Sequence, residues 1–200
     1  MKIRSLLVTF LILVTESCNG QKFSAGACPT ITPMAITIAN PGLLGAWVEY
    51  ARTFNVGEHG WKCVVYNIAA VTATQESITV TGVHKITGTA KTATGTINNN
   101  GVTAAMMVFT GTLSVSFNNN KIIGRNTPVT YSVVGRDVNA AALWITLYGC
   151  RNVGLGKLEY VVILTKLRSP AIADVTAAFN AATAAGVPAS LIKKTDQTGC

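Results

Sequence analysis

The stretch NPGLLGAWVEYARTF, residues 40–54, decides how the rest of this sequence is interpreted. A turn formed by Asn, Pro and Gly leads to Gly45 and Trp47, where a β-strand is expected to begin. Because Gly45 has no side chain, the backbone can bend tightly just before Trp47. A single G-x-W occurs in many barrels and sandwiches, so its meaning depends on the segments around it.

Residues 1–20 of the 200-residue chain have the pattern of a secretory signal peptide. Two basic residues precede an apolar run at 6–14, which is too short to cross a bilayer, and small residues precede Gln21. The alternative is a membrane anchor. No later stretch is long and apolar enough to span a membrane. We therefore expect a secreted, extracellular protein whose single domain occupies residues 21–200.

The mature chain would keep four cysteines, Cys28, Cys63, Cys150 and Cys200. In a secreted protein, four cysteines predict two disulfides, for which three pairings exist. The cysteines are too far apart for a zinc site of the CxxC type, and the chain has only two histidines. We therefore expect no bound metal.

Charge and motifs argue against two classes of function. The formal net charge is +8, but the 16 basic residues are scattered and are not interleaved with aromatic residues, so we expect no nucleic-acid binding. The sequence contains no G-x-S-x-G, P-loop or H-E-x-x-H motif, and its 8 acidic residues are not spaced for acid–base catalysis. We expect neither an enzyme nor any catalytic residue.

Residues 45–168 have an all-β pattern, rich in Thr, Val, Ile and Tyr. The Asn-rich tracts at 98–101 and 118–120 predict hairpin turns. Because no helix separates the strands, they are expected to form an antiparallel meander. Hydrophobic periodicity alone does not distinguish a barrel from a sandwich. The predicted strands are 46–54, 62–70, 77–87, 93–97, 103–109, 112–117, 129–135, 142–150 and 158–168.

Residues 171–187 are rich in alanine and predict one amphipathic helix that ends at Gly186. We expect Ile172, Val175 and Phe179 to dock on the wall of the sheet. The cysteine at position 200 is expected to fasten the tail that follows the helix.

Six segments, taken in order, resemble the lipocalins, and in particular the group that contains apolipoprotein D, insect bilin-binding proteins and crustacyanins. They are GACP at 26–29, NPGLLGAWVEYAR at 40–52, KCVVYNI at 62–68, ALWITLYGC at 142–150, EYVVILTKLRSP at 159–170 and LIKKTDQTGC at 191–200. The family's T-D-Y motif is matched only by Arg136-Asp137-Val138, and the turn that follows is expected to carry an insertion. Residues 88–110 match weakly.

The resemblance implies an all-β, eight-stranded antiparallel up-and-down barrel with one C-terminal α-helix. It implies the disulfides Cys28–Cys150 and Cys63–Cys200. It also implies that Trp47 packs at the closed end of the barrel, with a cation from the last strand across its ring. Either Lys166 or Arg168 can fill that role.

The function implied by the resemblance is carriage of a small hydrophobic ligand inside the barrel, most closely a pigment such as biliverdin or a carotenoid. The alternatives are a colourless carrier of fatty acid, sterol or retinoid, and a structural subunit of a carotenoprotein, as a homo- or hetero-oligomer. His59 and His84 are expected at the surface.

The side chains that face the ligand are those that the resemblance implies, by alignment with the strands of the family and by the alternation of residues along each strand. If Trp47 points inward, Glu49 and Ala51 should do the same. A buried Glu49 needs a partner, either a structural hydrogen bond or a pyrrole nitrogen of the ligand. By the same alternation Leu164 also faces inward. The residues predicted to bind ligand are Glu49, Val64, Tyr66, Ile68, Ile78, Val80, Tyr131, Val133, Ile145, Leu147, Tyr160 and Val162.

Overall fold

The computed structural model describes residues 22–37, 42–53, 58–72, 74–100, 108–109, 112–117, 129–139 and 142–200. The predicted signal peptide and the predicted turn at 118–120 lie outside these residues, so both remain predictions.

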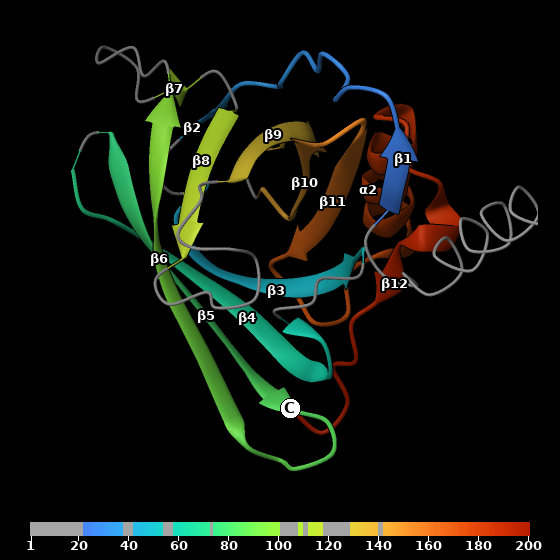
Figure 1. Cartoon of the computed structure of the whole chain (residues 1–200). Helices are drawn as coiled ribbons and strands as arrows, with labels where there is room; N and C mark the ends of the chain where they lie inside the picture. The colour runs from blue at the N-terminus through green and yellow to red at the C-terminus, as the bar shows by residue number, and fades with distance from the viewer. Residues whose placement is uncertain are drawn as a thin grey trace, which may run out of the picture.

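Within the described chain, eight antiparallel strands close into a barrel (Figure 1). Each of these strands pairs with the next of them along the chain. The last pairs with the first, so the sheet closes on itself. The barrel, and not the sandwich, is therefore confirmed. The strands are β3 (Gly45–Arg52), β4 (Trp61–Ala70), β5 (Gln75–His84), β6 (Ala90–Asn100), β8 (Thr112–Phe117), β9 (Val129–Arg136), β10 (Trp144–Val153) and β11 (Gly156–Thr165).

One prediction in the weakly matching region was wrong, and another is confirmed only at the two residues that the structure describes. Asn98 to Asn100 were assigned to a turn, but β6 continues through them and pairs with Ser114 to Thr112 of β8. Strand pairing overrides their turn preference, and Asn98 also accepts a hydrogen bond from Gln75 Nε2 at 3.0 Å. The predicted strand at 103–109 is described only as β7 (Val108–Phe109), which pairs with β2 (Ile36–Thr37) in a separate two-stranded sheet.

Short strands from both ends of the domain extend the sheet beyond the eight-stranded barrel. Near the N-terminal end, β1 (Lys22–Ala25), which was not among the predicted strands, pairs with the first residues of β11. Near the other end, β12 (Lys193–Lys194) pairs with the last residues of β3. Both additions cover β-strand edges where the barrel strands diverge.

A β-bulge in β3 reverses the expected alternation. Leu164 of β11 is paired with Glu49 and the preceding Ile163 with Ala51, so Tyr50 is an extra residue in β3. Ala51, which was predicted to face inward, therefore packs in the outer cluster with Ile163, and that prediction was wrong. The next residue, Arg52, forms ion pairs with the buried Glu49 and with Glu58.

The helix α2 (Ile172–Ala184) packs on the outer wall formed by β9, β10 and β11 (Figure 1). Its buried residues are Ala178 and Ala182. Phe179 contacts the ring of Tyr50 edge-on, with the ring centroids 6.5 Å apart. Ile172, however, is 85% exposed, so the prediction that it docks was wrong. At about 100° per residue, Ile172 lies about 120° around the helix from Ala178.

Glycine at position 135 sets how closely the helix approaches the sheet. A second bulge, in β9, turns Gly135 toward α2, and a Cβ placed there would overlap the Cβ of Ala181 and lie 3.2 Å from the ring of Trp144. We predict that Gly135→Ala lowers the free energy of unfolding by about 1–3 kcal/mol, because the helix must shift outward. Urea denaturation followed by circular dichroism measures this change.

The control is the double variant Gly135→Ala/Ala181→Gly, in which the overlap is removed from the other side. Its loss of stability should be smaller than the sum of the two single losses. Additive losses would show that the contact between these two positions does not limit the approach of the helix.

Candidate ligand-binding site

The inward-facing side chains of the barrel form one buried apolar cluster. The structure brings together the apolar residues predicted to bind ligand, with two qualifications. Tyr131 is only half-buried and packs against the cluster. Tyr160 lies on the inward face of β11 but is not a member of the cluster. Whether they touch a ligand remains a prediction. The buried members of the cluster that were predicted are Val64, Tyr66, Ile68, Ile78, Val80, Val133, Ile145, Leu147, Val162 and Leu164.

Sequence analysis missed several members of this apolar cluster. Leu113 and Val115 alternate with Ser114 in a period of two, which is a signal that could have identified them. Ile97 lies beside the Asn tract that was mistaken for a turn. Leu43 precedes β3, so strand alternation does not predict its position.

Trp47 and Lys166 close one end of the barrel interior. The indole Nε1 of Trp47 donates to the carbonyl of Leu43 at 2.8 Å, and the Nζ of Lys166 lies 3.7 Å from the centroid of the Trp47 ring. Lys166 also donates to the carbonyls of Leu44 and Ala46, each at 3.3 Å. Burial lowers the pKa of this lysine. A cation placed over an indole stabilises the fold by about 0.5–2 kcal/mol.

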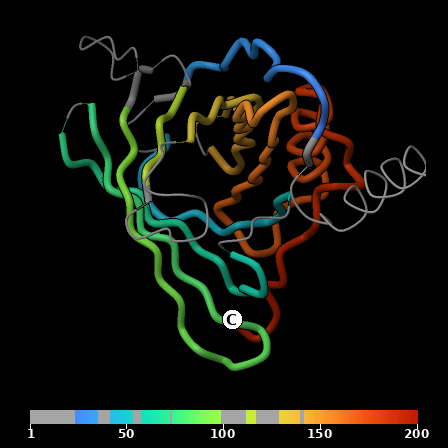
Figure 2. The backbone as a smooth tube through the Cα atoms, in the orientation of Figure 1, coloured from blue at the N-terminus to red at the C-terminus, as the bar shows by residue number. Residues whose placement is uncertain are grey.

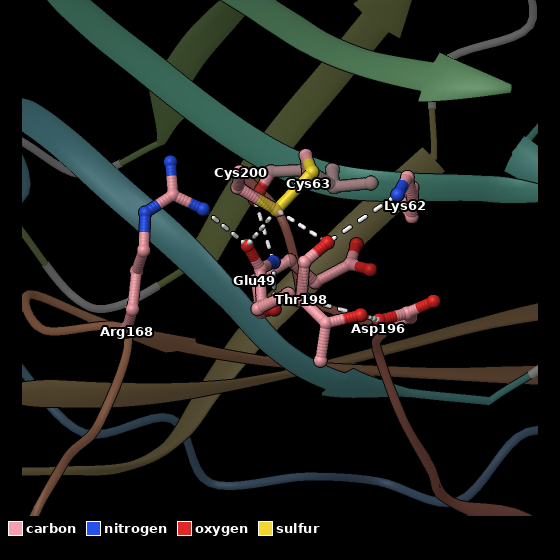
Figure 3. Close-up of a disulfide and its surroundings, with 9 residues drawn as sticks. Glu49, Lys62, Cys63, Arg168, Asp196, Thr198 and Cys200 are labelled. Carbon is pink, nitrogen blue, oxygen red and sulfur yellow. Dashed lines mark hydrogen bonds between the residues drawn. A yellow bond between two sulfur atoms is a disulfide. The ribbon is translucent and has the colours of Figure 1, made fainter. Parts of the chain in front are cut away.

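Of the two cations proposed for this role, Lys166 therefore contacts Trp47. Arg168 instead donates from Nη1 to Gln197 Oε1 at 2.6 Å (Figure 3).

The turn after β9 is held by Asp137. Its carboxylate accepts hydrogen bonds from the backbone N–H groups of Asn139 and Leu143, each at 3.0 Å. Burial alone would raise the pKa of Asp137, but these hydrogen bonds outweigh it and lower that pKa. The aspartate of the partial T-D-Y match thus has a structural role at the same end as Trp47.

Toward the opposite end, four inward-facing polar side chains form what we call the charged cluster: Glu49, Arg52, Glu58 and Tyr66. Arg52 Nη1 is ion-paired with Glu49 Oε1 and lies 3.0 Å from Glu58 Oε2. Arg52 Nη2 donates to the carbonyl of Glu58 at 2.6 Å. The Tyr66 hydroxyl donates to Glu49 Oε2 at 3.0 Å and lies 3.2 Å from Glu58 Oε1. Glu49 was predicted here, whereas Arg52 and Glu58 were missed.

Burial and charge together change the pKa values of Glu58, Arg52 and Tyr66. Burial and the negative charge of Glu49 raise the pKa of Glu58 to about 8, although the charge of Arg52 opposes this. Burial would lower the pKa of Arg52, but the two carboxylates outweigh it and raise that pKa. Burial and the same two carboxylates raise the pKa of Tyr66 well above its usual value. At neutral pH, Glu58 is therefore mostly protonated.

Two further tyrosines face the barrel interior near the charged cluster. The Tyr131 ring lies against Gly149, where an added Cβ would come within 3.0 Å of the ring. Burial raises the pKa of Tyr131, and so do the charges of Glu58, Tyr160 and Glu49, so these groups are neighbours. The Tyr160 hydroxyl is buried and has no hydrogen-bond partner.

The C-terminal segment seals a gap in the barrel wall beside this cluster. Pairing of β3 with β4 ends at Val48 and Val65, beyond which the two strands diverge. Gln197 Nε2 bridges the gap by donating to the carbonyls of Glu49 at 2.9 Å and Val64 at 3.3 Å. Thr195 Oγ1 donates to Glu49 Oε1 at 2.6 Å. We call residues 193–198 the sealing segment.

Two disulfides join distant parts of the chain, with the pairing that the resemblance implied. Cys28–Cys150 links the N-terminal segment to β10. Cys63–Cys200 fastens the sealing segment to β4 (Figure 3). The C-terminal stretch of the backbone, red in Figure 2, ends at this second bond. Cys63 also donates from its backbone N–H to the carbonyl of Asp196 at 2.9 Å. The sealing segment is thus held by covalent, backbone and side-chain contacts.

The histidines are placed outside the charged cluster. His59 is exposed, and His84 Nδ1 lies 3.2 Å from Thr87 Oγ1 in the turn after β5. Among the residues that the structure describes, no three His, Cys, Asp or Glu side chains are grouped as a metal site requires. No helix in the described part of the chain is long and apolar enough to cross a membrane.

We predict that replacing Glu58 with glutamine flattens the dependence of stability on pH. The raised pKa of Glu58 means that the folded protein holds a proton that the unfolded chain releases above about pH 4.5. This contribution to stability is complete below about pH 4.5 and is lost as the pH rises through about 8. The free energy of unfolding, measured in urea from pH 5 to pH 8.5 (roughly the range of the shift), should fall less in the variant. Equal slopes would contradict this account.

We also predict that the double variant Cys63→Ser/Cys200→Ser lowers the free energy of unfolding by about 2–5 kcal/mol, because the sealing segment loses its covalent tether. The control is Gln197→Ala, which keeps the disulfide but removes the two hydrogen bonds from Gln197 Nε2 across the gap. It should lower the free energy of unfolding by about 1–3 kcal/mol. Urea denaturation of the three proteins provides the comparison. If the double variant is as stable as the unaltered protein, hydrogen bonds alone are enough to hold the sealing segment in place.

The chain matches no family model, and comparison with curated proteins found no match. Solved structures do resemble it. Insecticyanin from the tobacco hornworm Manduca sexta is 17% identical and superposes with a TM-score of 0.71 over 90% of this chain and 91% of its own. H1 crustacyanin from the lobster Homarus americanus is 18% identical, with a TM-score of 0.69 over 88% and 91%.

The allergen Per a 4 from cockroaches is also similar, with 16% identity and a TM-score of 0.60 over 87% of this chain and 97% of its own. These similarities extend over most of each chain and include the barrel and its helix. This chain therefore has the lipocalin fold.

Proposed function

We propose that this protein is a secreted lipocalin that carries a small hydrophobic ligand inside its barrel. The observation that carries the proposal is the inward face of the closed barrel, where side chains from all eight strands are apolar over most of its length. Such a surface, closed at one end by Trp47 and Lys166, favours an apolar guest.

The class of ligand that we favour is a pigment of the biliverdin or carotenoid type. The resemblance of the sequence to bilin-binding proteins and crustacyanins supports it, as do the similar folds of insecticyanin and H1 crustacyanin. Fatty acids, sterols and retinoids are the alternatives. Phenols of Tyr66, Tyr131 and Tyr160 give the interior hydrogen-bonding groups that a polar-edged pigment requires.

Carriage, rather than catalysis, is the function that the charged cluster supports. Arg52 is engaged by both Glu49 and Glu58, and Glu49 also accepts hydrogen bonds from Tyr66 and Thr195. Groups held in this way have structural partners and do not form an evident nucleophile–base pair.

A role as a subunit of a coloured oligomer is less well supported. Exposed apolar side chains on the outer faces of the strands would favour it. Among the described residues, the exposed large hydrophobic side chains lie mainly on turns, loops and α2, such as Ile86, Leu155 and Ile172, and in the strands only Val153, at the end of β10, is one of them. Size-exclusion chromatography of the purified protein distinguishes a monomer from an assembly.

Secretion rests on the sequence pattern at residues 1–20 and agrees with the two disulfides. N-terminal sequencing of protein from its source should begin at or near Gln21.

Tryptophan fluorescence tests ligand carriage, because Trp47 and Trp61 contact the inner cluster whereas Trp144 packs on the outer wall. In the variant Trp144→Phe, biliverdin or a carotenoid should quench the emission in a saturable way. Adding Val162→Phe, at the most exposed of the inward valines, should weaken binding about tenfold or more by filling the site.

The matched control is Leu155→Phe, on an exposed turn next to β11, which should leave the affinity unchanged. Absence of quenching by apolar compounds of every class, or equal affinity in the two phenylalanine variants, would count against carriage in the barrel. A visible absorption band in protein purified from its source would identify a pigment directly.

A further inference from the structure

The charged cluster holds two buried carboxyl groups and one guanidinium. Glu49 and Glu58 share one guanidinium, that of Arg52, whose Nη1 and Nη2 groups are both engaged by protein oxygens. An anionic group entering this part of the barrel would meet two carboxyl groups and no uncommitted terminal nitrogen of Arg52. A cationic group would instead pair with Glu58 once that carboxyl group gives up its proton, and the cluster would then hold two negative and two positive charges.

The cluster faces the inside of the barrel, at the end away from Trp47. Glu49 and Arg52 lie farther along β3 than Trp47, and Glu58 follows in the connection to β4. The buried hydroxyl of Tyr160, which is 3% exposed and has no partner, belongs to the same region through its neighbour Tyr131. An unpaired buried hydroxyl costs free energy unless a ligand supplies a hydrogen bond.

We propose that the barrel interior selects hydrophobic ligands that carry a protonated amine over those that carry a carboxylate. This inference rests on the proposed carrier function and specifies the chemistry of the ligand's polar end. It disfavours biliverdin among the ligands considered above, because biliverdin carries two carboxylates. The ammonium group pairs with the carboxylate of Glu58, while the apolar part of the ligand contacts the inner cluster. The lone pairs of the Tyr160 hydroxyl accept one of the ligand's N–H groups.

Binding of the ammonium is linked to loss of a proton from Glu58. In the free protein Glu58 holds a proton near neutral pH, because burial and Glu49 raise its pKa. A bound cation stabilises the carboxylate, so the O–H bond of Glu58 ionises and the proton leaves to solvent. Affinity for the amine therefore rises with pH up to about 8, and it falls only where the amine itself loses its proton, near pH 10 (roughly).

Four basic and phenolic groups in this region have raised pKa values. Arg52 and Tyr66 keep their protons because their pKa values are raised, and burial raises the pKa of Tyr131 as well. Burial also raises the pKa of Tyr160. The buried Glu76 lies on the same inward face of β5 but near its start, at the Trp47 end of the barrel.

Three probes with the same twelve-carbon tail (a chain length chosen to be about that of a small fatty acid) test the inference: dodecylamine, dodecanol and dodecanoate. Isothermal titration of the purified protein at pH 7.5 (roughly neutral) should show dodecylamine binding about tenfold or more tightly than dodecanoate. The formal net charge of +8 attracts anions to the surface, so non-specific binding would produce the opposite order. Titrations in buffers of different ionisation enthalpy should detect about one proton released per amine bound.

The key variant is Glu58→Gln, which should abolish both proton release and the preference for dodecylamine over dodecanoate. Its matched control is Glu159→Gln. Glu159 is also buried, but it lies on the outer wall, where Lys157 Nζ is 3.2 Å from it and Tyr148 donates to it at 2.9 Å. The control should retain both properties.

The possible results separate the two proposals. If dodecanol binds but dodecanoate binds as well as dodecylamine, the selectivity inference is overturned and the carrier function stands. If none of the three probes binds, the carrier function itself fails for ligands of this size. If Glu58→Gln does not fold, amine binding by the unaltered protein at different pH values still tests the inference. An affinity for dodecylamine that stays constant from pH 6 to pH 8 (about the range of the shift) would contradict the link between amine binding and loss of the Glu58 proton.

Discussion

One additional residue in β3 determines both surfaces of the barrel wall. The bulge at Tyr50 places Tyr50 and Ala51 on the outer face, where they pack with the cluster that receives α2. The same bulge turns Arg52 inward to the two carboxyl groups. Without that extra residue, strict alternation would put Ala51 inside and Arg52 on the helix side. The packing of the helix and the composition of the charged cluster therefore depend on one local feature.

Arg52 is also what allows Glu49 to be fully buried in an otherwise apolar interior. A buried carboxylate without partners would be very costly, and here it has a guanidinium, the Tyr66 hydroxyl and the Thr195 hydroxyl. Thr195 comes from the sealing segment. The segment that closes the barrel wall therefore also supplies one of the hydrogen bonds that stabilise the buried Glu49 carboxylate. Glu58 is the member with the least compensation, and for that reason it retains a proton.

The fold was predictable because its signals are strong over long segments. Strand-forming stretches without intervening helices predicted the antiparallel sheet, and the ordered motifs from Gly26 to Cys200 distinguished the barrel from a sandwich. Errors occurred where pairing overrides local preference, as at Asn98, or where one residue changes the face of a strand, as at Ala51. The inward apolar positions followed from alternation. Arg52 and Glu58 did not, because a bulge and a loop position have no periodic signature.

The sealing segment has a consequence for biosynthesis. The gap between β3 and β4 is bridged by residues 195–198, which follow these strands by more than a hundred positions in the chain, as the separation of 137 between the two bonded cysteines shows. During translation the chain can form its β-hairpins in order. The gap between β3 and β4 beside Glu49, however, stays open until residues 195–198 have been translated and the Cys63–Cys200 disulfide has formed. For the secreted carrier that we propose, a ligand bound before this closure would lie in an incompletely closed barrel. We therefore expect ligand binding to follow translocation, in the compartment where disulfides form.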